Sequence, residues 1–254
     1  SSVVRLMDWT ATNTNLVERW SDRRGPLDAA REGGRVTGPH GTVWRSWDRG
    51  VALEHQIQLC NALHADCWIN IPVFANDEFV RKIAQALRFG TDGTEPYDGP
   101  VAEPLFPPLD PSLHVYVEYA NEIWNSAVGF DCQQAVMDLV ASLPSDHPAL
   151  VPPADTVWQA VWRYPAYRIA VAGDIFRTVF GDDAMMTKVR PVLMTQQGDG
   201  QGTLSTALVW LDAYARRRSP ARRVSDYLYG AGGSAYYSPE RNAAGAVPRT
   251  PFGD

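Results

Sequence analysis

The sequence has few cysteines, only two lysines and no long apolar run. Its three cysteines, Cys60, Cys67 and Cys132, form no Cys-x-x-Cys pair and no zinc-spaced cluster with histidine. They are expected to be buried apolar thiols, although one disulfide plus one free thiol is the alternative. No stretch approaches 18 apolar residues, so no membrane span is predicted.

Other signatures are missing as well. The net charge of −6 argues against a nucleic-acid surface, which is usually basic. No glycine-rich phosphate loop follows a predicted strand. The histidines fall in loops, helices or a strand start, so no two-histidine metal site is predicted; they are His40, His55, His64, His114 and His147. The sequence therefore predicts no metal, no cofactor and no nucleic-acid partner.

Strand and helix patterns alternate along the chain. Strands are predicted over 3–7, 67–71, 114–119, 189–194 and 227–235, and helices near 53–63, 77–87, 130–143, 156–180 and 204–214. Pro165 is expected to kink or divide the fourth helix. Residues 21–50 and 90–112 are interpreted as long loops. Alternating strands and helices indicate a parallel sheet.

Polar and aromatic residues gather where these strands end, and this favours a barrel over a doubly wound sheet. They are Asp8, Trp9, Asn70, Asn121, Glu122, Gln196, Tyr236 and Tyr237. We therefore predict an α/β fold, an incomplete TIM-barrel-like (β/α)8 domain spanning 1–254. Trp9, Trp124, Tyr236 and Tyr237 are candidates for stacking on sugar rings, whereas Trp158, Trp162 and Trp210 are expected in the core.

The third strand runs directly into Asn121 and Glu122. A carboxyl group at the end of a buried strand is partly desolvated, and desolvation raises the pKa of a carboxyl. A glycosidase needs such an acid to protonate the leaving oxygen and then act as a base on water. The Asn121 amide suits a sugar hydroxyl, Trp124 offers a stacking face and Asn125 a further donor. Glu122 is therefore the predicted acid/base.

The run Val117–Asn125, with Asn121-Glu122 before Ile123-Trp124-Asn125, resembles the strand-four signature of the clan A retaining glycoside hydrolases. The resemblance implies a TIM barrel acting on a β-linked polysaccharide, with the predicted strands numbered two to six. It implies that Arg5 matches a site arginine and that Tyr236 matches an aromatic that orients the nucleophile. The layout is also similar to that of secreted bacterial proteins that carry cellulose-binding modules, so secretion is expected.

The sequence departs from this family at the nucleophile, which is a Glu closing strand seven. The only acid between Tyr236 and Asp254 is Glu240, in a segment with a loop pattern. Glu118 lies on the same strand as Glu122 but about 13 Å from it, too far for a retaining pair. We expect Glu118 to be a buried acid paired with Arg5 or Arg190. Both ends of the chain look like cuts through a longer protein.

Three interpretations remain open at this point. The first is a glycoside hydrolase whose nucleophile lies outside this sequence or is missing. The second is a non-catalytic glycan-binding or structural protein with a degenerate barrel. The third, a lyase or aldolase, lacks a suitable Schiff-base lysine, because Lys82 falls on a helix and Lys188 at the wrong end of a strand. Sugar, linkage and oligomeric state are not readable from the sequence.

Overall fold

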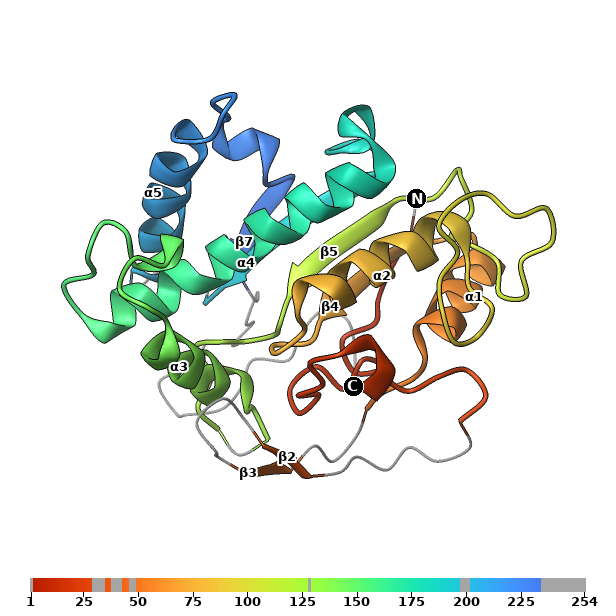
Figure 1. Ribbon diagram of the computed structural model, residues 1–254, viewed down its shortest axis with the longest axis horizontal. Coiled ribbons are helices and arrows are strands. Elements are labelled where there is room, and N and C mark those ends of the chain that lie inside the picture. Colours follow the sequence, from red (N-terminus) through yellow and green to blue (C-terminus); the bar gives the residue numbers. More distant parts are fainter. Residues whose placement is uncertain are drawn as a thin grey trace, which may run out of the picture.

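The computed structural model describes residues 2–28, 35–37, 43–45, 49–127, 129–196 and 202–233. Its centre is a five-stranded, entirely parallel sheet that curves as a half-barrel (Figure 1). Its strands, in spatial order, are β1 (Val3–Arg5), β4 (Asp66–Ile71), β5 (Val115–Tyr119), β6 (Val189–Thr195) and β7 (Gly230–Gly233). This order follows the chain without reversal, as in a barrel wall, whereas a doubly wound sheet reverses at a switch point.

Side chains along the strands alternate between two faces of the sheet. The outer face carries apolar side chains, and in the register of β4 and β5 Cys67 lies beside Val115 and Ile69 beside Val117. All four are at most 1% exposed. The inner face carries the residues between them, where Trp68 lies beside Tyr116 and Asn70 beside Glu118. The core thus lies on the outer side.

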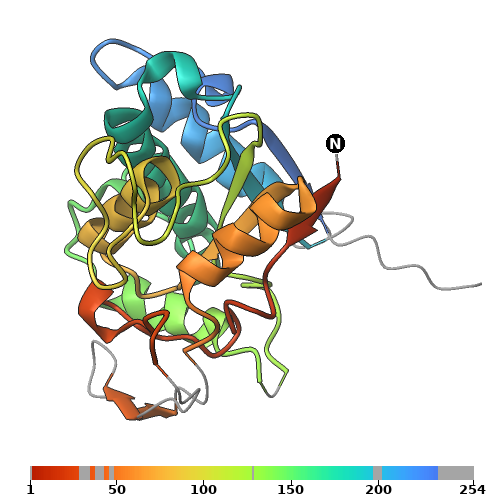
Figure 2. The ribbon, with the colours of Figure 1, turned by 90° about the vertical axis from the view of Figure 1, so that its right-hand side faces the viewer.

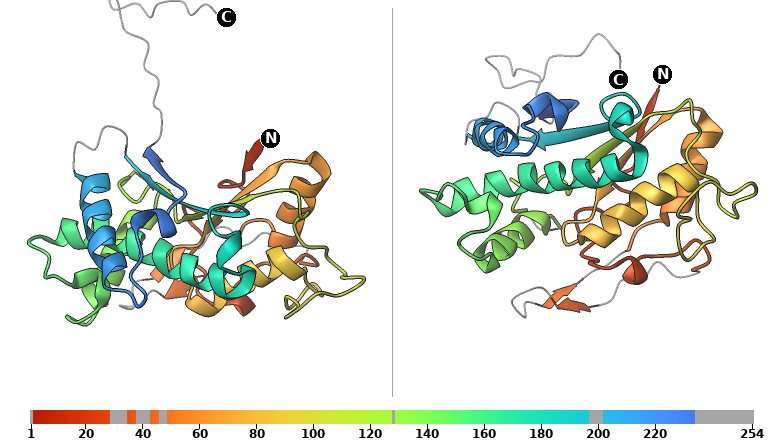
Figure 3. Two further views of the ribbon diagram at one scale, coloured as in Figure 1. Left: turned by 90° about the horizontal axis from the view of Figure 1, so that it is seen from above. Right: turned by 45° about the horizontal axis from the view of Figure 1, so that its top comes forward.

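Helices connect successive strands and cover the outer face. They are α1 (Leu53–Leu63), α2 (Asp77–Phe89), α3 (Cys132–Ser142), α4 (Val157–Phe180) and α5 (Thr203–Arg216). Helix α4 packs between α2 and α5 (Figures 1 and 3), and α1 lies close to β1 (Figure 2). Asn76 caps α2 by accepting a hydrogen bond from Phe79 N at 2.9 Å, and Thr156 caps α4 by accepting one from Gln159 N at 3.2 Å.

The sequence predicted a long loop over residues 21–50, but the structure also has regular elements there. Residues Trp20–Asp22 form a 3-10 turn, and β2 (Arg35–Thr37) pairs antiparallel with β3 (Val43–Arg45). These strands have three residues each, too few for an alternating pattern to stand out in the sequence. The hairpin formed by β2 and β3 lies apart from the main sheet, on the side toward which the strands of the main sheet run (Figure 1).

Other element predictions also need correction. The first strand ends at Arg5 because the chain turns at once, with Thr10 N donating to Leu6 O at 2.9 Å. The last strand begins only at Gly230, after a 3-10 turn over Val224–Asp226. Pro165 does not divide α4, because the buried packing of this helix outweighs one lost backbone hydrogen bond.

The predictions for buried side chains are mostly confirmed. All three cysteines are buried free thiols, and burial raises the pKa of Cys132 to about 12. Trp162 and Trp210 are in the core, as expected, but Trp158 is 42% exposed and stacks on the ring of Trp162. No described helix is both long and apolar enough to cross a membrane.

Candidate functional site at the strand ends

The backbone after β5 is held in an unusual conformation. Ala120 has φ 56° and Glu122 has φ 42°, in the left-handed region that residues with a side chain rarely adopt. Two hydrogen bonds fix this turn to β4: Ala120 N donates to Ile71 O at 2.9 Å, and Asn70 Nδ2 donates to Ala120 O at 2.8 Å. Such strain persists only where its surroundings enforce it, and it concentrates at functional sites.

Asn121 is fixed by partners from two other segments. Its side-chain Oδ1 accepts a hydrogen bond from Arg5 Nη2 at 3.0 Å, and its Nδ2 donates to Asn13 Oδ1 at 2.8 Å. The residue is 3% exposed. Because one atom accepts and the other donates, these bonds also fix which way the amide faces.

Glu122 is half-buried and contacts Asn125 in the turn after β5. Asn125 Nδ2 donates to Glu122 Oε2 at 2.8 Å, and Asn125 N donates to Glu122 O at the same distance. The Oδ1 of Asn125 accepts from Ala127 N at 2.9 Å. Asn125 therefore orients the Glu122 carboxylate, in addition to any contact with a ligand that the sequence predicted.

Glu118 is buried and pairs with Arg5, which is one of the two partners, Arg5 or Arg190, that the sequence predicted. Both of its carboxylate oxygens accept from Arg5, over distances of 2.9 to 3.2 Å, and Trp68 Nε1 donates to Oε2 at 2.8 Å. Glu118 is 2% exposed, so burial raises its pKa, and the Arg5 guanidinium and the Trp68 indole oppose this rise. Arg190, the other candidate, instead donates to Tyr116 Oη at 2.7 Å.

Five of the predicted site residues take part in these bonds, which form a network around the turn after β5. Arg5 donates to Asn121 and Asn70 donates to Ala120 O, and Asn125 donates to Glu122, the next residue along the chain from Asn121. Of the other predicted residues, Asp8 and Trp9 are exposed after β1, with Trp9 40% exposed, and Gln196 is half-buried after β6. Trp124 packs against the core, which leaves less of its ring for stacking. The predictions for Tyr236, Tyr237 and Glu240 lie outside the described residues.

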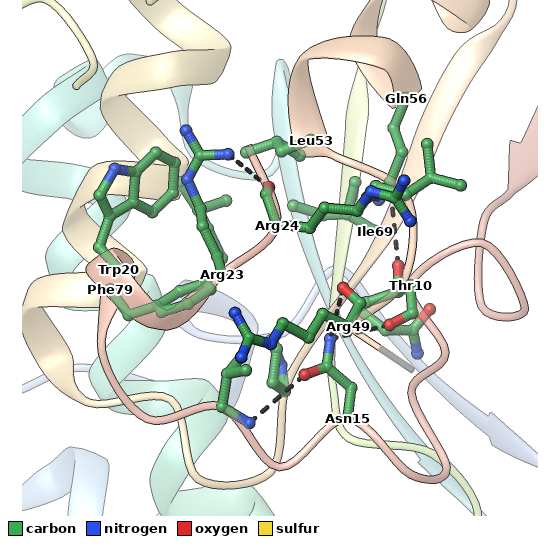
Figure 4. Close-up of a pocket in the computed structure, with 15 residues that line it drawn as sticks. Thr10, Asn15, Trp20, Arg23, Arg24, Arg49, Leu53, Gln56, Ile69 and Phe79 are labelled. Carbon is green, nitrogen blue, oxygen red and sulfur yellow. Dashed lines mark hydrogen bonds between the residues drawn. The ribbon is translucent and has the colours of Figure 1, made fainter. Parts of the chain in front are cut away.

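A pocket adjoins this network at Asn70, which is one of its lining residues (Figure 4). Thr10 and Asn15 from this loop line it, together with residues of α1, α2 and the end of β4. Its accessible space is about 50 Å³. Three arginines also line it, Arg23, Arg24 and Arg49.

The pocket wall near Gly50 needs a residue without a side chain. Gly50 has φ 71°, and a Cβ there would lie 2.5 Å from Trp9 O and 2.6 Å from Thr10 O. The next residue, Val51, donates from its backbone N to Trp9 O at 2.6 Å. The chain entering α1 is thereby held against the loop after β1.

Sequence reasoning missed Asn13 and the three arginines of the pocket. Asn13 stood in a polar loop, 108 residues from the partner it binds. The arginines lie in or beside the segment interpreted as a long loop, where no periodic pattern shows which side chains converge. The only signal in the sequence for this pocket was the large number of arginines in that segment.

Within the part of the chain that the structure describes, no group of three or more His, Cys, Asp and Glu side chains is placed to hold a metal ion. Comparison with protein-family models, curated proteins and solved structures found no match for this chain.

Proposed function

We propose that this chain forms a TIM-barrel-like glycoside hydrolase domain that acts on a β-linked polysaccharide by a retaining mechanism, outside the cell. The observation that carries the proposal is the setting of Glu122: a half-buried carboxylate at the carboxyl end of a buried parallel strand, on strained backbone, beside an amide locked by Arg5 and Asn13. Barrel enzymes build their sites at this end of the strands.

In this proposal Glu122 acts as the general acid and then as the general base. It donates a proton to the glycosidic oxygen as the bond to the leaving sugar breaks, and it then removes a proton from the water that attacks the glycosyl intermediate. Asn125 donates to one oxygen of the carboxylate and so helps to fix its orientation. A retaining reaction also needs a nucleophilic carboxylate about 5–5.5 Å away, which we propose lies outside the described residues.

The test compares Glu122→Gln with the wild-type protein on β-glucans, mannans and xylans. Loss of general acid catalysis should lower kcat by about 10²–10⁴-fold. Glu103→Gln is the matched control. Glu103 is exposed and lies in the loop between α2 and β5, which leads to the start of β5 and not to its carboxyl end. It should retain full activity.

Leaving-group chemistry separates an acid role from a structural one. In an aryl glycoside of an acidic phenol, the phenolate leaves without protonation. Glu122→Gln should therefore break this glycosidic bond, in the first step of the reaction, nearly as fast as the wild type. Equal activity of the variant on polysaccharide would disprove the acid/base role. If the wild type binds polysaccharide but never cleaves it, the non-catalytic glycan-binding alternative is the better description.

A further inference from the structure

Two of the three arginines that line the pocket beside the Glu122 network have no acidic partner among the described residues. Arg23 is balanced, since its guanidinium pairs with Glu54 at 2.7 Å and both side chains are at most 8% exposed. Within the described ranges, Arg24 donates to the backbone oxygens of Asp28 at 3.0 Å and Gly50 at 3.5 Å. Neither Arg24 nor Arg49 forms an ion pair within the described ranges. Two cationic side chains thus line a small pocket in a protein of net charge −6.

A buried donor in the same pocket also lacks a partner. The Nε–H of Arg23 is buried and makes no hydrogen bond within the described structure, although both Nη atoms of the residue are engaged. On the β4 side, the buried Oδ1 of Asn70 is likewise without a partner. Buried polar groups are nearly always satisfied, so the orphaned donor beside two uncompensated guanidiniums points to an anionic ligand.

The size of the pocket restricts which part of a ligand enters it. One water needs about 10–15 Å³ of such accessible space, so about 50 Å³ holds roughly three or four waters. That suits a carboxylate or a sulfate group and is too small for a whole sugar ring. The ring bearing the group would remain at the mouth of the pocket.

The pocket and the proposed active site share the loop that follows β1. Thr10 and Asn15 line it, and Asn13, between them in the same loop, accepts a hydrogen bond at its Oδ1 from Asn121 Nδ2 at 2.8 Å. Asn15 Nδ2 in turn donates to Thr10 O at 2.9 Å, which makes the loop compact. A glycan lying across the strand ends at Glu122 would therefore extend over this loop toward the arginines.

We propose that the pocket formed by Arg23, Arg24 and Arg49 binds the carboxylate of a uronic acid unit, so that the substrate is an acidic β-linked glycan. This inference rests on the proposed function, because it assumes that a glycan lies across the strand ends. A sulfate ester on the sugar would present the same oxyanion chemistry, and the experiment below separates the two sources.

The test is calorimetric titration at low ionic strength with three β-1,4-linked tetrasaccharides: cellotetraose, tetraglucuronate and cellotetraose 6-sulfate. Every protein carries Glu122→Gln to prevent cleavage. Tetraglucuronate differs from cellotetraose only at C6, so it should bind about tenfold tighter or more, as expected for one charge-assisted contact. Added salt should weaken its binding and leave that of cellotetraose unchanged.

Arg24→Gln and Arg49→Gln should each reduce tetraglucuronate affinity by about tenfold and leave cellotetraose affinity unchanged. Arg49 is the cleaner position, because its side chain makes no hydrogen bond to the other described residues, and Arg49→Lys should restore part of the affinity. Arg81→Gln, an exposed position on α2, is the matched control and should change neither affinity. Unchanged melting temperatures would show that each variant folds.

The outcomes separate this inference from the proposed function. Equal affinity for cellotetraose and tetraglucuronate, or equal loss of both in Arg49→Gln, would overturn the carboxylate pocket and leave the glycosidase proposal standing. Tight binding of the 6-sulfate alone would overturn the uronic acid and assign a sulfated sugar. Binding of none of the three would overturn the pocket, and the hydrolysis assay on neutral polysaccharides would still report on the proposed function.

Discussion

The two faces of the central sheet are both buried in the middle of β4 and β5 but are stabilised differently. On the outer face Ile69 and Val117 are each 1% exposed under the helices. On the inner face their neighbours Asn70 and Glu118 are 3% and 2% exposed. The first pair is stabilised by removal of apolar surface from water. The second pair is polar, so its burial is tolerated only because hydrogen bonds replace those lost to water.

This difference separates folding from chemistry within one sheet. Apolar packing has no preferred direction, so the outer face accepts side chains of similar volume. Hydrogen bonds are directional, so the inner face fixes Arg5, Glu118 and Asn121 in one arrangement. The outer face therefore provides stability, and the inner face places the polar groups at the strand ends.

The largest effect should come from a cavity on the outer face. Ile69→Ala removes buried methyl and methylene groups and should lower the free energy of unfolding by about 2–5 kcal/mol. The matched inner-face variant is Met194→Ala, which removes a side chain that is only half-buried and should cost less than about 1 kcal/mol. Urea unfolding of both variants measures the difference. Equal losses would mean that the inner face is packed as tightly as the outer one.

The sheet was largely predictable because its middle strands are short buried runs bounded by helices. The predictions for β4, β5 and β6 agree with the structure to within one residue at each end, and Arg5 was one of the two partners predicted for Glu118. The edge strands β1 and β7 are shorter than predicted. Turns beside them use apolar residues such as Leu6 and Tyr227, which look like strand in the sequence.

The pocket and the Asn13 contact were not predictable, because they depend on how loops meet. The bond between Asn13 and Asn121 joins two loops, and neither loop has a periodic pattern that fixes its direction. The same holds for Arg23 and Glu54, which come from a turn and a helix. Prediction of the strand end at Glu122 needed only the position of one strand, whereas prediction of the pocket needed four segments placed together.

The pH dependence of stability tests the inner face at Glu118. Burial raises the pKa of this carboxyl above its ordinary value of 4.5. Below pH 4.5 it is protonated in both the folded and unfolded states, so its contribution to stability is fully present. As the pH rises through the folded-state pKa that contribution is lost, by about 1.4 kcal/mol for each unit by which the folded pKa is raised.

Glu118→Gln cannot ionise and should escape this loss. The variant should therefore gain stability relative to the wild type as the pH rises from 4 to 8, measured by urea unfolding at each pH. Ile69→Ala is the control, because its deficit should be the same at every pH. A variant that instead loses stability with rising pH would show that the Arg5 ion pair, and not burial, dominates the Glu118 carboxyl.

The smallest effect should come from a single hydroxyl on the inner face. Tyr116→Phe keeps the ring stacked on Trp68, at 5.4 Å between centroids, but removes the oxygen that accepts from Arg190 Nη1 at 2.7 Å. Because the pair is only partly buried, the cost should be about 0.5 kcal/mol, the lower end for a protein hydrogen bond. Arg190 would still donate from Nε to Thr187 O at 3.1 Å. A loss above about 2 kcal/mol in urea unfolding would therefore mean that the directional bonds of the inner face contribute as much to stability as the packing of the outer one.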